Sequence, residues 1–70
     1  MSKIESPVSG RVVAVHVNAG DTLSAGDAIL TVESMKMEIP VEAERSGTVS
    51  EVLVQIDDEV SEGQSVATLA

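Results

Sequence analysis

The chain consists of short valine-rich stretches separated by small or acidic residues. Within these stretches apolar and polar residues alternate, a pattern that predicts half-buried β-strands. Turn signals recur at close spacing, at Gly20-Asp21 and Gly26 in the first half of the chain. We find no stretch with apolar residues at three- and four-residue spacing between helix caps, so no helix is predicted. The pattern therefore predicts an all-β protein with short antiparallel strands.

The second half of the chain repeats the pattern of the first. A shift of 37 positions (46 minus 9) places Ser46-Gly47 on Ser9-Gly10. Such self-similarity indicates a duplicated supersecondary unit. The other matched pairs are Val12 with Val49, Val15 with Val52, Val17 with Val54, Asp21 with Asp58, Ser24 with Ser61, Gly26 with Gly63 and Thr31 with Thr68.

Two units that are each hydrophobic on one face bury their apolar surfaces by packing together. We therefore predict one domain over residues 1–70, a flattened antiparallel β-barrel or sandwich of two small four-stranded sheets with approximate twofold symmetry. Its expected parts are a first half at about 6–33, a hairpin at 34–37 and a second half at about 42–70.

One irregularity occurs in both halves. Val12 and Val15 are three residues apart, and strict alternation would place them on opposite faces of a strand. An extra residue in the strand would restore a common face. We therefore predict a β-bulge near Val13-Ala14, and another at the matching positions Ser50-Glu51.

The segment between the halves predicts a hairpin whose two turn residues are Met35 and Lys36. This choice places Leu30, Val32, Ile39 and Val41 on one face, as a buried face requires. It also places Thr31 and Pro40 in a pair without hydrogen bonds, where the missing N–H of proline costs nothing. The full register pairs Ser34 with Met37, Glu33 with Glu38, Val32 with Ile39, Thr31 with Pro40 and Leu30 with Val41.

The turn residues are poor choices for stability. A two-residue hairpin turn favours Asn-Gly or Asp-Gly, and holding a side-chain-bearing residue at positive φ costs roughly 1–2 kcal/mol. Glu33 opposite Glu38 adds repulsion between like charges. We interpret the tip as kept for chemistry: it would offer the Lys36 amine to another enzyme for acylation. The alternative is that Lys36 is an ordinary solvated turn residue and that Met35 and Met37 are incidental.

Composition excludes several other functions. The 70 residues include no cysteine and no aromatic residue, and the formal net charge is -8. Disulfides, thiolate metal sites and base stacking are thereby excluded, and binding to nucleic acid or an anionic membrane is disfavoured. We find neither an N-terminal signal nor a membrane-spanning run, so we expect a soluble, cytoplasmic and monomeric domain. The single His16 and the scattered acidic residues indicate neither a catalytic nor a metal site.

The motif Glu33-Ser-Met-Lys-Met-Glu38, between two glycine-punctuated halves, resembles the biotinyl-lysine motif of biotin carboxyl carrier domains. The resemblance covers essentially the whole chain. It implies the biotinyl/lipoyl domain fold and a carrier that is not itself an enzyme. Lys36 would be biotinylated by a biotin protein ligase, then carboxylated at a biotin carboxylase and discharged at a carboxyltransferase. The implied setting is an acyl-CoA carboxylase, an enzyme type of fatty acid biosynthesis.

The same resemblance assigns roles around the lysine. Met35 and Met37 would hold the biotin arm and contribute to recognition. Glu33, Ser34 and Glu38 are candidates for recognition by the ligase or the carboxylase, although solvated hairpin charges are the simpler interpretation of the two glutamates.

The chain departs from the family pattern in two respects. Asp57-Asp58 stands where many relatives have Gly-Asp, but aspartate tolerates a left-handed backbone well enough for the turn to form. No insertion separates the early strands, so we expect this chain to lack the protruding segment, called a thumb, of some bacterial relatives, and with it any biotin contact that a thumb makes.

Two alternatives stay open. Lipoyl carriers share the fold and use a hairpin lysine, usually in a sequence that resembles Asp-Lys-Ala, and some attachment proteins accept either cofactor. The second alternative is an unmodified interaction module of the same fold.

Overall fold

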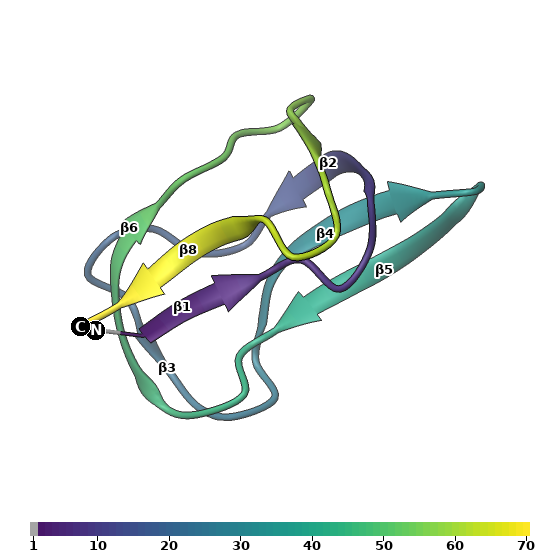
Figure 1. The fold of residues 1–70 in the computed structure, drawn as a ribbon. Helices are drawn as coiled ribbons and strands as arrows, with labels where there is room; N and C mark the ends of the chain where they lie inside the picture. The colour runs from purple at the N-terminus through teal and green to yellow at the C-terminus, as the bar shows by residue number, and fades with distance from the viewer. Residues whose placement is uncertain (1) are drawn as a thin grey trace.

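The computed structural model describes residues 2–70, which form eight β-strands and no helix (Figure 1). The predicted all-β fold class is confirmed. The strands are β1 (Ser2–Glu5), β2 (Gly10–Val15), β3 (Thr22–Leu23), β4 (Ala28–Ser34), β5 (Met37–Glu42), β6 (Gly47–Val52), β7 (Glu59–Val60) and β8 (Ser65–Leu69).

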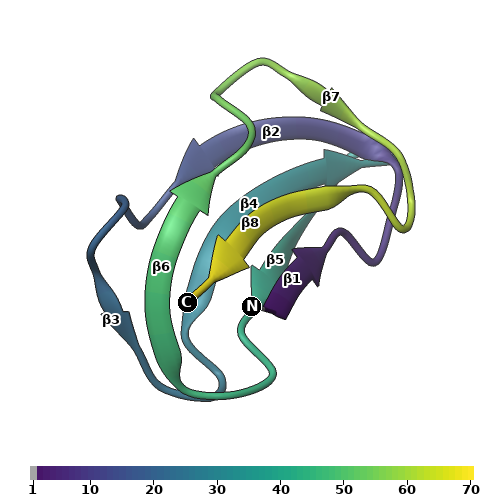
Figure 2. The same cartoon turned by 60° about the vertical axis from the view of Figure 1, so that its left-hand side comes forward.

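The strands form two antiparallel four-stranded sheets that curve around a common interior (Figure 2). The terminal sheet has the order β1-β8-β6-β3, and the hairpin sheet has the order β5-β4-β2-β7. A shift of 37 residues carries β2 onto β6, β3 onto β7 and β4 onto β8, and it carries β1 onto residues 39–42 of β5. The two sheet orders therefore correspond strand for strand, which confirms the predicted quasi-twofold symmetry.

Both predicted bulges are present. The pairing of β2 with β4 shifts register between Val12 and Ala14, and the pairing of β6 with β8 shifts between Val49 and Glu51. A second pair of irregularities was not predicted: the register also shifts between Ala28 and Leu30, and at the equivalent place in β8. The extra residues there, Ile29 and Val66, are fully buried.

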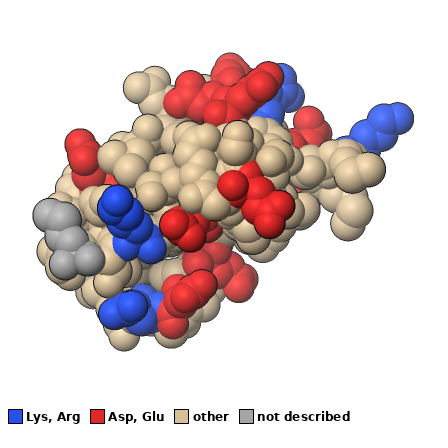
Figure 3. All heavy atoms as spheres, viewed as in Figure 1, with Lys and Arg blue, Asp and Glu red and all other residues tan. Residues whose placement is uncertain are grey.

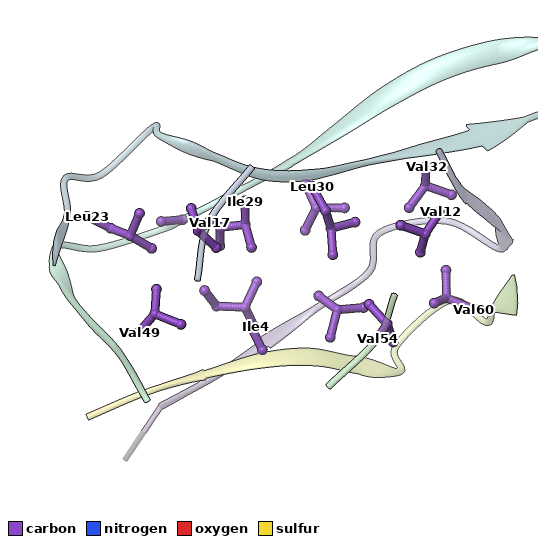
Figure 4. Close-up of a cluster of buried hydrophobic side chains, with 14 of the residues drawn as sticks. Ile4, Val12, Val17, Leu23, Ile29, Leu30, Val32, Val49, Val54 and Val60 are labelled. Carbon is purple, nitrogen blue, oxygen red and sulfur yellow. The ribbon is translucent and has the colours of Figure 1, made fainter. Parts of the chain in front are cut away.

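Aliphatic side chains from both sheets meet in a single core (Figure 4). Because no aromatic residue is available, the interior is filled by aliphatic side chains, most of them β-branched, a type that suits a pleated surface. Among residues 2–70, valine contributes eight of the fifteen buried hydrophobic residues and methionine contributes none. These residues are Ile4, Val12, Val17, Leu23, Ile29, Leu30, Val32, Val41, Ala43, Val49, Val54, Val60, Val66, Ala67 and Leu69.

Equivalent turns join each half to the other. The Gly20 N–H donates to the Val49 carbonyl at 2.8 Å, and the Asp57 N–H donates to the Val12 carbonyl at 2.8 Å. Both turn residues have positive φ, 95° at Gly20 and 78° at Asp57. The expectation that aspartate can replace glycine in this turn is thus confirmed, at the cost of a left-handed backbone at Asp57.

Candidate functional site in the β4–β5 hairpin

The hairpin between β4 and β5 has the register predicted from the sequence. Ser34 pairs with Met37, and the pairing continues without interruption to Leu30 and Val41. Met35 and Lys36 are the two turn residues, with φ of 52° and 66°. Positive φ at both central positions is the signature of a type I′ turn, whose twist matches that of the flanking strands. The strain that the sequence predicts at this turn is therefore present.

The side chains of the tip lie in solvent. Met35 is 93% exposed, Met37 is 64% exposed, and Lys36 is also exposed. A basic side chain projects from the molecule at the end where the β4–β5 hairpin is drawn (Figure 3). Since these side chains are free of the body of the domain, an enzyme that acylates an amine could reach the lysine without unfolding any part of the domain.

The root of the hairpin is held firmly, in contrast to its tip. Val32 is fully buried and Val41 almost so, and both pack into the common core. On the other side of β4, Gly10 of β2 approaches so closely that a Cβ atom there would overlap the Glu33 carbonyl oxygen. The lysine is thus presented by a flexible side chain on a rigid support.

The outer face of the hairpin sheet carries a row of charged residues beside the tip. Arg11 pairs across strands with Glu33 on β4 and with Glu59 on β7, while Glu33 in turn faces Glu38 on β5. The Arg11 Nη2 atom lies 3.6 Å from Glu33 Oε1, and both side chains are about half exposed. This pair offsets the predicted repulsion between Glu33 and Glu38, although an exposed ion pair contributes only about 0–1 kcal/mol.

Sequence reasoning did not identify Arg11. The only available signal was the register of β2 against β4, which depends on the bulge between them. Of the residues proposed for partner recognition, Glu38 is exposed, whereas Glu33 and Ser34 are partly buried. All three lie within the same end of the hairpin as Lys36.

His16 and the acidic residues are the other chemical candidates in the sequence. His16 is exposed, and its Nε2 atom lies 2.9 Å from Thr31 Oγ1 on the outer face of β4. Within residues 2–70, no three histidine or acidic side chains are grouped closely enough to hold a metal ion. The same residues contain no helix of the length and hydrophobicity that crossing a bilayer requires.

Comparison with known proteins places this architecture among biotin- and lipoyl-bearing proteins. A family model with the description "Biotin-requiring enzyme" matches residues 1–69. The biotin/lipoyl attachment protein of Bacillus subtilis (strain 168) is 44% identical over 63 residues, which cover 90% of this chain and 86% of that protein. The biotinylated protein TB7.3 homolog of Mycobacterium leprae (strain TN) is 37% identical over 67 residues, covering 96% and 94%.

Larger proteins contain a similar segment. The dihydrolipoyllysine-residue acetyltransferase component of the pyruvate dehydrogenase complex from Cupriavidus necator is 48% identical over 52 residues, covering 74% of this chain and 9% of that protein. In the crystal structure of Kluyveromyces lactis urea carboxylase, a segment superposes with a TM-score of 0.93 at 33% identity. That match covers 99% of this chain and 6% of the carboxylase.

Proposed function

Because this chain belongs to the biotin/lipoyl attachment family, we propose that Lys36 carries covalently attached biotin and that the domain transports a carboxyl group between enzymes. The observation that carries the proposal is the solvent-exposed Met35-Lys36-Met37 tip, held at positive φ on a rigid hairpin. Methionine on both sides of the lysine favours biotin over lipoate. Similarity to proteins named as biotinylated and as a carboxylase supports the same choice.

The proposed reaction uses one group of this chain, the Lys36 amine. A base on the modifying enzyme removes a proton from the Lys36 ammonium group. The free Nζ attacks the activated carboxyl group of biotin, forms an amide and expels the activating group. The lysine charge is lost, and the product is a long neutral arm.

The modified domain would then visit partner active sites in turn. We propose a biotin carboxylase and a carboxyltransferase of an acyl-CoA carboxylase-type enzyme as these partners, since the chain resembles segments of carboxylases. The partners supply the catalytic groups, and this domain supplies position and reach. Glu33, Ser34 and Glu38 lie at the hairpin end and would contact basic surfaces on these partners.

A lipoyl carrier is the second candidate function. The 48% identity to the acetyltransferase component of a pyruvate dehydrogenase complex favours it, as does the name of the Bacillus subtilis relative. In that case Lys36 would still be the acylated residue, and only the acyl group and the partners would differ.

The deciding experiment is the intact mass of the purified protein after incubation with a biotin protein ligase or with a lipoyl ligase. The chain contains two lysines, so Lys3→Arg is a matched control for Lys36→Arg. We expect one biotinyl group on the native protein and on Lys3→Arg, and none on Lys36→Arg. Attachment of lipoate alone would favour the second candidate. A protein that accepts neither group would refute both.

A further inference from the structure

The side chains that are most easily oxidised gather at the hairpin tip. The chain has no cysteine, tryptophan or tyrosine, so its three methionines are its main targets for mild oxidants. Met1 lies outside the described residues. The other two, Met35 and Met37, are the most exposed large hydrophobic residues, at 93% and 64%.

Oxidation at these positions would leave the fold intact. The core described above contains valine, isoleucine, leucine and alanine but no sulfur atom. Neither Met35 nor Met37 packs into it, so making them polar creates no buried defect. Any effect of oxidation is therefore confined to contacts that the tip makes with other molecules.

We propose that Met35 and Met37 are a reversible modification site, at which hydrogen peroxide switches off the acylation of Lys36. This inference rests on the proposed function. Each thioether adjoins Lys36 in the chain, so an enzyme that encloses the Lys36 amine also covers these side chains. A thioether is apolar and is covered readily, whereas a sulfoxide is a polar group that must lose its water when it is covered.

The oxidation step is balanced with peroxide as the sole oxidant. The methionine sulfur attacks one peroxide oxygen, an S–O bond forms and the O–O bond breaks. The departing hydroxide takes the remaining proton, so the products are a sulfoxide and one water, with sulfur oxidised by two electrons. Peroxide is uncharged at neutral pH, and the protein charge of -8 therefore does not repel it. A methionine sulfoxide reductase with a thiol donor reverses the step.

The test compares the rate of acylation by the ligase before and after treatment with hydrogen peroxide. Peptide mass mapping counts the sulfoxides on Met35 and Met37, and circular dichroism checks that the fold persists. The matched control is the double variant Met35→Leu/Met37→Leu, which keeps Met1 and His16 and so retains every other target. Each protein is compared with its own untreated sample, so the ratio of the two rates is the readout.

We expect the oxidised native protein to be acylated more slowly by roughly tenfold, a factor that corresponds to about 1.4 kcal/mol in the barrier. Treatment with the reductase should restore its rate, and peroxide should leave the rate of the double variant unchanged. An unchanged rate in native protein that carries both sulfoxides would overturn the proposal. So would an equal slowing in the double variant, or a slowing that the reductase does not reverse. If untreated native protein is not acylated at all, the proposed function itself has failed.

Discussion

Gly10 and Gly47 are equivalent by the internal repeat, yet the structure predicts opposite outcomes for the same substitution at the two sites. At Gly10, a Cβ atom would overlap the Glu33 carbonyl oxygen and lie 2.8 Å from Val32 Cγ1. At Gly47, the nearest atom would be Leu69 Cδ1 at 3.3 Å, the end of a side chain that can move. Backbone cannot yield in the same way, so Gly10→Ala must separate β2 from β4.

Overpacking costs about 1–3 kcal/mol, and a rigid backbone obstacle places Gly10→Ala at the upper end of that range. For a domain of this size, each kcal/mol lowers Tm by roughly 4–8 °C, so we expect a fall of more than about 10 °C. Gly47→Ala should change the stability by less than about 1 kcal/mol, because the reduced entropy of the unfolded chain offsets the tight contact.

Thermal unfolding of both variants is followed by far-ultraviolet circular dichroism, since the chain has no aromatic residue to report by fluorescence. Gly10 and Gly47 occupy equivalent positions at the start of β2 and β6. Effects common to any glycine replacement at this position therefore cancel when the two variants are compared. Melting temperatures that agree within about 4 °C would show that the close approach of β2 to β4 does not constrain the hairpin.

Four other substitutions have defined outcomes. Lys36→Ala should change the stability by no more than about 0.5 kcal/mol, as is usual for an exposed site, and so leave Tm nearly unchanged in calorimetry. A large fall in Tm would mean that the lysine is structural. Asp57→Gly removes the strain of a side-chain-bearing residue at a φ of 78° and should raise the free energy of unfolding, measured by urea titration, by about 0.5–1 kcal/mol. Gly20→Asp introduces the same strain and should lower that free energy. If both substitutions change the free energy of unfolding in the same direction, the strain argument is wrong. Pro40→Val restores an N–H that points outward from the edge strand β5, where the strand of another molecule can pair with it. Sedimentation velocity at raised salt should therefore detect self-association of this variant. A variant that stays monomeric at all concentrations would argue that Pro40 does not protect the edge from pairing.

The sequence predicts this fold well because its information is repeated and local. Asp21 and Asp58, with the matching valines, identified the duplicated unit, and the hydrophobic face of residues 30–41 determined the hairpin register. The three-residue spacing of Val12 and Val15 was enough to predict a bulge, because one wrong-facing valine breaks the parity of a strand.

Other features could not be predicted from the sequence, for physical reasons. The irregularity at Ile29 cannot be seen in the sequence pattern, because Ile29 and Leu30 are both apolar and both buried. A run without polar residues does not reveal where the alternation between the two faces of the strand is broken. The contact of Arg11 with Glu33 depends on the register between two strands, which is set by that same kind of irregularity. The exposure of the tip likewise depends on how far the hairpin extends beyond the packed sheets.

In the described residues, β1 begins and β8 ends at the end of the molecule opposite the tip of the β4–β5 hairpin (Figure 1). Ser2 pairs with Leu69, so the start of β1 and the end of β8 lie side by side, and this pair is equivalent by the internal repeat to Ile39 and Val32 of the hairpin sheet. A fluorescent protein, an affinity tag or an immobilising surface joined to either end would therefore leave the amine unobstructed. Connecting the two ends by a short loop and reopening the chain elsewhere should likewise preserve both sheets, which makes the domain a good starting point for circular permutation.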